Sequence, residues 1–232
     1  MAANSTLRPA GRAPRRGASR APSQKPFYVT KVAQIRAIAS AIRQDIVDAT
    51  AVIGPCAISS LAAFLGRRPD SLYYHVSALQ RVGLLTVAGE TTTDRGRRVP
   101  LYDVPGRPVL LRYDPGNPRN RDAVARFATT TLRSANRAFA RALSQGGVTV
   151  EGELRDLWTA RWKGWLTRED LAEVNALLAR LIGLLRRGAG HADPEATLCE
   201  LTFVLAPVRP RSATRPAASD APRRRHAPRR AR

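Results

Sequence analysis

Apolar residues recur at steps of three and four between Val32 and Val52, which is the spacing of one face of an α-helix. They are Val32, Ile35, Ile38, Ala39, Ile42, Ile46, Val47 and Ala51. Gly54 and Pro55 follow this stretch and stop a helix. The pattern predicts a single amphipathic helix over residues 32–52.

Two shorter helical patterns come next. In the first, Ala57 to Leu65, four positions face inward, and Gly66 suits a left-handed helix end. The inward positions are Ile58, Leu61, Ala62 and Leu65. The second runs from Asp70 to Val82, where Pro69 is tolerated in a first turn and Asp70 favours the positive end of the helix dipole. Its inward residues are Leu72, Val76 and Leu79, and Gly83 ends it.

A strand pair is expected directly after these helices. Residues 84–87 and 99–104 have the composition of strands, and the polar, glycine-containing stretch AGETTTDRGRR between them is typical of an exposed hairpin tip. Three short helices followed by a two-stranded hairpin predict a winged helix-turn-helix.

The rest of the chain is predicted to be mainly helical. A broad apolar stripe spans Asn120 to Ser144, and Thr167-x-x-Asp170 resembles a capping box at the start of a helix over Arg168–Arg187. That second helix has a nearly coiled-coil seam of Leu171, Val174, Leu178, Leu181 and Leu185. Three apolar runs, 109–113, 157–166 and 198–208, are expected to form a small sheet. The predicted class is α+β, mainly α.

The segment DSLYYHVSALQRVGLL has the polarity that a DNA-reading helix needs. A helix fits the major groove of B-DNA, a second helix braces it, and the wing reaches nearby phosphate or minor groove. With the apolar residues facing in, the outward positions are Ser71, Tyr73, Tyr74, Ser77, Gln80 and Arg81. Two exposed tyrosines on a polar face favour DNA binding over an ordinary three-helix packing unit.

Residues 36–104 resemble the winged-helix domain of ArsR-like bacterial regulators. The resemblance rests on RAIASAIRQDIVDA, ISSLAAFLGRRPDSLYYHVSALQRVGLL and RRVPLYDV, about a third of the chain. It implies a homodimer that binds a partly palindromic operator in double-stranded DNA. Under it, bases or nearby phosphates are contacted by Ser71, Tyr73, Tyr74, Ser77 and Arg81. Phosphate would be held by Arg67 and Arg68 and by the wing residues Arg95, Arg97 and Arg98, although a solvated loop also explains the wing arginines.

Metal-sensing relatives carry closely spaced cysteines in the reading helix, and this chain has none there. His75 occupies a position that is more often structural than metal-binding. His191, Asp193, Glu195 and Cys199 could outline a site, but a loop of incidental polar residues is the simpler interpretation. We therefore expect no metal and no cofactor. No phosphate-cradling glycine loop and no nucleophile motif appears, so we expect no enzyme.

Charge and the predicted elements together divide the chain into four parts. The net charge is +21, of which residues 1–26 and 207–232 supply +14. These two tails are rich in Pro, Ala, Ser and Arg and are predicted to be disordered, with a loose affinity for polyanions. Between them we expect a DNA-binding domain over 27–106 and a dimerisation or sensing region over 107–206. Two distant cysteines and no apolar membrane span favour a cytoplasmic, nucleoid-associated protein.

Two functional alternatives follow from these patterns. The first is a sequence-specific transcriptional regulator, and the second is an architectural protein that coats DNA through its basic tails. The tryptophans Trp158, Trp162 and Trp165 also have two interpretations. They could pack in the core or dimer interface, or they could wall a pocket for a small apolar effector.

Overall fold

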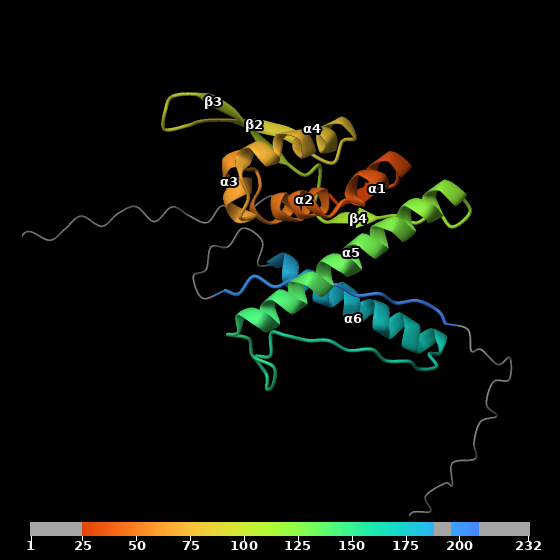
Figure 1. Ribbon diagram of the computed structural model, residues 1–232. Helices are drawn as coiled ribbons and strands as arrows, with labels where there is room; N and C mark the ends of the chain where they lie inside the picture. The colour runs from red at the N-terminus through yellow and green to blue at the C-terminus, as the bar shows by residue number, and fades with distance from the viewer. Residues whose placement is uncertain (1–24, 188–195, 209–232) are drawn as a thin grey trace, which may run out of the picture. The chain divides into compact units, whose positions relative to one another are not determined.

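The computed structural model describes residues 25–187 and 196–208 and has an α+β fold (Figure 1). Its first half contains the strand β1, the helices α1–α4 with the 3₁₀ turn η1, and the strands β2–β4; two long helices, α5 and α6, follow. In chain order the elements are β1 (Phe27–Val29), α1 (Val32–Ile38), α2 (Ala41–Ile53), α3 (Ile58–Phe64), η1 (Pro69–Ser71), α4 (Tyr73–Arg81), β2 (Thr86–Thr92), β3 (Arg98–Asp103), β4 (Val109–Leu111), α5 (Pro118–Gln145) and α6 (Arg168–Arg187).

The prediction of one helix over residues 32–52 is wrong, because the helix is interrupted between α1 and α2. Ser40 adopts an extended backbone and begins α2. The carbonyl of Ala39, which ends α1, instead accepts a 3.1 Å hydrogen bond from the Thr130 hydroxyl of α5. Residues on both sides of the break face the same core, so the apolar spacing continues across it and conceals it.

The helix-turn-helix forms as predicted, with one difference at its second helix. Gly66 has φ +60°, as expected for the residue that ends α3. The predicted helix from Asp70 divides into η1 and then α4, which begins at Tyr73. Leu72, Val76 and Leu79 are buried, which confirms their predicted inward orientation.

The predicted wing is an antiparallel hairpin of β2 and β3. Its register runs from Thr86 opposite Asp103 to Thr92 opposite Arg98, with an irregularity between Val87 and Gly89. The strand β2 therefore begins two residues later than predicted and extends further. Cys56, in the loop before α3, exchanges two backbone hydrogen bonds of 3.0 and 2.8 Å with Tyr102 of β3. This bridge attaches the base of the wing to the helical part.

The predicted small sheet is largely wrong. Of the three apolar runs, only 109–113 contains a strand, β4, and it pairs in parallel with β1. Residues 157–166 and 198–208 form no strand. A strand needs a partner for its backbone groups, and the apolar pattern of these two runs does not supply one.

A single hydrophobic core lies beneath α1–α4 and the base of the wing. Its largest fully buried side chains are Ile35, Ile46, Leu61, Leu72, Leu79, Leu84, Leu85, Val29 and Val76. The first half of α5 covers one side of this core: Ala123 is buried in it, and Val124 and Phe127 pack against it. The later part of α5 contributes no buried residue.

The buried ion pair of Arg107 and Asp103 ties the end of β3 to the end of α2. The Arg107 guanidinium group binds the Asp103 carboxylate and also donates to the carbonyls of Thr50 at 3.0 Å and Ala51 at 2.8 Å. Both carbonyls belong to the last turn of α2: that of Thr50 also accepts from the Gly54 amide at 2.8 Å, whereas for Ala51 the residue four positions on is Pro55, which has no amide hydrogen. Gly54 passes close by, since a β-carbon there would lie 2.5 Å from the Thr50 oxygen.

The two long helices match their predicted ranges closely. Asn117 caps α5 by accepting hydrogen bonds from the amides of Arg119 and Asn120. The predicted capping box of α6 is confirmed, with Thr167 and Asp170 bonded in both directions at 2.8 and 3.1 Å. No helix in the described ranges is long and apolar enough to cross a membrane.

Candidate nucleic-acid interface

Most of the predicted polar and aromatic side chains of η1 and α4 are exposed to solvent. Tyr74 is 69 % exposed and Tyr73 56 %, and Ser71 and Ser77 are exposed beside them. Gln80, predicted to face outward, is half-buried. Burial of Leu72, Val76 and Leu79 fixes the rotation of the helix, so the opposite face must point outward. This arrangement gives α4 a surface of hydroxyl and aromatic groups.

Arg67 and Arg68 lie in the turn between α3 and α4, and both are exposed. Arg68 is within 3.9 Å of Asp70, but both of these side chains are more than four-fifths exposed, so the pair is weak. Two exposed guanidinium groups therefore lie just before α4, where they can contact an anion.

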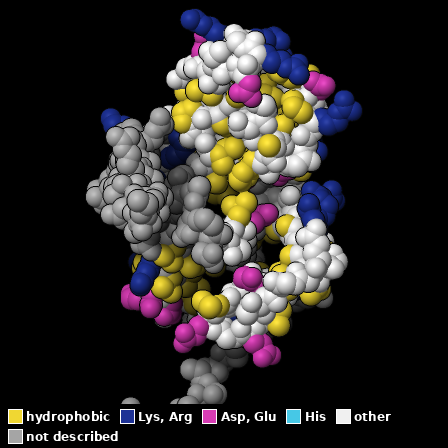
Figure 2. Space-filling view, turned by 90° about the vertical axis from the view of Figure 1, so that its left-hand side faces the viewer, with side chains coloured by type: hydrophobic (Ala, Val, Ile, Leu, Met, Phe, Trp, Pro, Cys, Tyr) yellow, Lys and Arg dark blue, Asp and Glu magenta, His cyan; other side chains and the backbone are white. Residues whose placement is uncertain are grey.

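The wing carries the other predicted arginines. Arg95 and Arg97 lie in the exposed tip between β2 and β3, and Arg98 is the first residue of β3. Arg98 is 3.9 Å from Glu90 across the hairpin, again between largely exposed side chains. In Figure 2, Lys and Arg side chains gather at the upper end of the view, where Figure 1 shows α4 and the hairpin. The helix α4 and the wing thus share one end of the domain.

The surroundings of His75 and Arg81 differ from those of the exposed tyrosines and Ser77 on α4. His75 is half-buried, and burial together with the charges of Arg43 and Arg67 lowers its pKa below the usual range. Arg81, at the end of α4, is exposed but lines a hollow with residues of α1 and α2. Arg36 and Arg43, to which no sequence pattern pointed, line the same hollow. Only their packing on neighbouring helices brings the three together.

The tryptophans do not follow the predicted strand geometry. Residues 155–167 form no helix or strand, so the alternation of Trp158 and Trp162 with Trp165 across a strand is wrong. Trp162 is 90 % exposed, and Trp158 is stacked beneath the Arg155 guanidinium group at 3.9 Å. Side chains this exposed are neither core residues nor walls of a closed pocket within the described part of one chain.

Other predicted features lie outside the described residues. Most of the two basic tails, residues 1–24 and 209–232, and the polar residues His191, Asp193 and Glu195 of the expected loop fall in this category. Cys199 is described and is an exposed free thiol, whereas Cys56 is buried. Among the described residues, no group of three or more potential ligands gathers around a possible metal position.

Comparison with known families supports the helix-turn-helix. A family model described as a helix-turn-helix domain matches residues 38–88, which include α2, α3, η1, α4 and the start of β2. No curated protein matches the chain. The matched range and the geometry agree, so the chain contains a helix-turn-helix domain of the kind with which transcriptional regulators bind DNA.

Proposed function

We propose that this protein is a sequence-specific transcriptional regulator of the ArsR-like type, acting on double-stranded DNA by binding alone. The observation that carries the proposal is the outward face of α4, where Tyr73, Tyr74 and Ser77 stand free of the core. In this proposal α4 enters the major groove, and its hydroxyl groups and aromatic edges contact bases or nearby phosphates. Arg81 at the end of α4 adds a phosphate contact.

The phosphate contacts on either side of the reading helix come from two places. Arg67 and Arg68 hold the backbone at the start of α4, and Arg95, Arg97 and Arg98 hold it under the wing. Contacts to phosphate set the register of the protein on the duplex, whereas contacts to base edges carry the sequence preference. Substituting a phosphate contact should therefore weaken binding to all DNA, whereas substituting a base contact should lower the preference for the operator.

We further propose that the protein binds its operator as a homodimer through α5 and α6. Leu132, Leu143, Leu181 and Leu185 are all more than two-fifths exposed, and no residue from 124 to 187 is buried. An apolar surface of this kind is costly to leave in water. A second copy is the occupant we favour, since two reading helices related by a twofold axis fit a partly palindromic site. The predicted pocket for a small apolar effector would then be completed between two subunits, where the tryptophans become enclosed.

The reading helix is tested by the double variant Tyr74→Ala, Ser77→Ala. We expect operator binding to weaken by about 1–3 kcal/mol for each base that the variant no longer touches, with binding to random DNA much less affected. The matched control is Tyr113→Ala, Ser144→Ala, which removes an exposed tyrosine and a serine outside α4. Normal operator affinity in the α4 variant, measured by fluorescence anisotropy, would show that this helix does not read DNA.

The charge of the tails supports a second candidate function, an architectural protein that coats DNA. Binding isotherms of the full chain and of residues 27–206 on operator and random DNA, at several salt concentrations, separate the two. Each phosphate contact adds about 0.9 to the slope of log K against log salt. For a regulator, removing the tails flattens this slope and leaves the ratio of operator to random affinity nearly unchanged. Complete loss of operator preference would favour the architectural function.

A further inference from the structure

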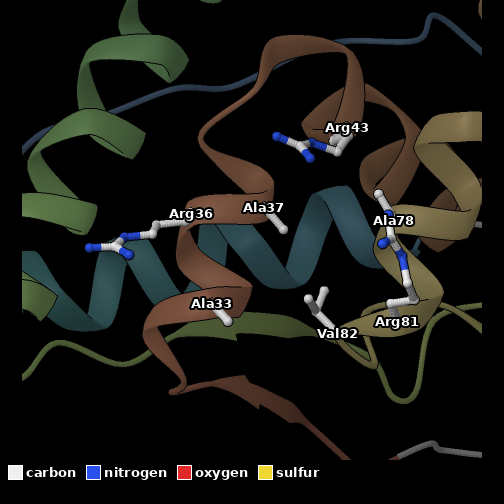
Figure 3. A pocket seen from close by; sticks show the side chains of 7 residues that line it. All are labelled: Ala33, Arg36, Ala37, Arg43, Ala78, Arg81 and Val82. Carbon is white, nitrogen blue, oxygen red and sulfur yellow. The ribbon is translucent and has the colours of Figure 1, made fainter.

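A hollow of about 360 Å³ lies where α1, the start of α2 and the end of α4 meet (Figure 3). Four apolar side chains, Ala33, Ala37, Ala78 and Val82, form its floor, and Arg36, Arg43 and Arg81 stand around it. In Figure 3, Arg43 and Arg81 lie on one side of Ala33 and Ala37, and Arg36 extends away from them on the other side. We call this site the arginine hollow. Its volume is at the lower end of the range of small-molecule pockets.

The three arginines of the arginine hollow have no counter-charge within the described part of the chain. None of their guanidinium groups forms an ion pair or a hydrogen bond with a described residue. Arg43 is half-buried, and its Nε atom is shielded from solvent without a hydrogen-bond partner among the described residues. A buried donor with no partner is costly, because it has lost its bonds to water. Arg43 therefore presents a recessed, unsatisfied cationic donor.

The walls of the hollow are held in place by specific contacts. Gln34 of α1 is buried, and its side-chain amide donates a 3.0 Å hydrogen bond to the carbonyl of Val82 at the end of α4. The same side chain accepts from the amide of Lys31, at the N-terminal end of α1, at 3.3 Å. The spacing between α1 and α4 is thereby fixed, and Arg43 and Arg81 border a preformed space.

Three arginines without an ion-pair partner among the described residues make the electrostatic potential near the hollow positive, and a neighbouring histidine is affected by it. His75 lies one turn before Ala78 on α4. Burial is the main cause that lowers the pKa of His75, and the charges of Arg43 and Arg67 lower it further. A cation is thus disfavoured in this part of the domain, and an anion is favoured.

We propose that the arginine hollow binds a small organic anion, with a carboxylate or phosphate group on Arg43 and an apolar body over Ala33, Ala37 and Val82. A guanidinium group binds such anions in a fork of two parallel hydrogen bonds, and the two terminal nitrogens of Arg43, unlike its Nε, are not shielded from solvent. Arg81 and Arg36 add charge from the two sides. The apolar floor selects for a ligand with hydrocarbon surface over an inorganic ion.

The same chemistry distinguishes this ligand from a DNA phosphate. Phosphates of a duplex are hydrated groups on its outer surface, and they have no apolar part to cover the floor. A small anion can also enter the hollow and reach the half-buried Arg43, whereas the exposed arginines of the wing and the α3–α4 turn suit a backbone contact. We therefore assign Arg43 to the small ligand.

The site connects to the reading helix through Arg81, Ala78 and Val82, which lie on α4 and at its C-terminal end. This consequence rests on the proposed DNA binding. An anion that engages Arg81 withdraws a positive charge from the DNA-binding surface, so the ligand should weaken operator binding, and operator should weaken ligand binding by the same factor. Binding of the anion itself requires no DNA.

The test uses the full-length protein without DNA and measures binding by calorimetry. The probes are benzoate and phenyl phosphate, with benzyl alcohol as the uncharged match and sulfate as an anion without an apolar body. We expect both organic anions to bind at least tenfold more tightly than either control. Arg43→Gln should lower their affinity at least tenfold, whereas Arg126→Gln, which removes an exposed arginine of α5, should change it less than twofold.

A second variant tests the apolar floor without disturbing the core. Ala33 is exposed, so Ala33→Leu should fold normally while filling the hollow, and it should lower benzoate affinity at least fivefold. The proposal fails if neither organic anion binds at millimolar concentration, or if Arg43→Gln and Ala33→Leu bind them as the unchanged protein does. Absence of anion binding together with weaker binding of Arg43→Gln to all DNA would make Arg43 a phosphate contact instead. These titrations contain no DNA, so the two proposals can fail separately. Normal operator binding by the α4 variant would contradict the proposed reading helix but not the anion site. Absence of anion binding would contradict the anion site but not the proposed reading helix.

Discussion

The two halves of this protein differ in how much of their apolar side-chain surface is buried within one chain. Among the described residues, nearly all the buried hydrophobic side chains lie between Val29 and Val104, and the one exception, Ala123, belongs to the same core. From 124 to 187 no side chain is buried, although α5 and α6 carry regular apolar stripes. The first half closes its core within one chain, and the second half has the pattern of a core without the partner that would close it.

This difference assigns separate physical roles to the two halves. A closed core makes the helix-turn-helix a rigid support, so that the outward side chains of α4 are held in one orientation. The stripes on α5 and α6 are instead available for association, which is the proposed dimer interface. Variants that unfold one chain should therefore cluster in the first half, and variants that change the assembly should cluster in the second.

The largest expected effect is a loss of folding stability in the first half of the chain, whose core is closed. Arg107→Ala leaves the buried Asp103 carboxylate without its ion-pair partner and removes a side-chain donor from the carbonyls of Thr50 and Ala51. Removing one member of a buried ion pair costs about 3–5 kcal/mol, so urea denaturation should show the free energy of unfolding falling by that amount. Arg98→Ala, which removes an exposed pair, should cost less than about 1 kcal/mol. Equal effects of the two variants would contradict the role given to Arg107.

The next effect concerns the second half of the chain, where the apolar stripes of α5 and α6 are not buried. Leu178→Asp places a charge in the middle of the α6 seam and should leave a monomer in light scattering at micromolar concentration. Operator affinity should then fall about 100-fold, because the two half-sites are no longer bound together. The control Ala176→Asp adds the same charge on the opposite side of α6 and should preserve the dimer. An unchanged protein that is already monomeric at this concentration would contradict the proposed assembly.

The smallest expected effect is on the N-terminal cap of α6, which stabilises the helix locally and independently of its packing. The hydrogen bonds with Thr167 lower the pKa of Asp170 below its ordinary value, so the carboxylate stabilises the folded helix above the ordinary pKa. That contribution is lost as the pH falls through the lowered value. Helical circular dichroism of the unchanged protein should therefore decrease on acidification more than that of Asp170→Asn, which should already be slightly less helical at neutral pH. Glu169→Gln is the control, and an acid response that it abolishes would point away from this cap.

Local features of the chain were readable from the sequence because their physics is local. The inward set Leu72, Val76 and Leu79, the left-handed Gly66, and the reciprocal bonds of Thr167 with Asp170 all act within a few residues. The exposed tyrosines of α4 followed directly from that inward set. The predicted DNA-binding residues themselves stay a prediction, since their partner is DNA.

Only the tertiary structure decided the features that join distant parts of the chain. The break between α1 and α2 depends on Thr130 of α5, and the parallel pairing of β1 with β4 joins strands from opposite ends of the DNA-binding half. The two other apolar runs had the composition of strands but found no such partner. The arginine hollow likewise draws its charges from three helices. Periodicity shows which face of an element is apolar, but the neighbour that covers this face is set by the packing of the whole chain.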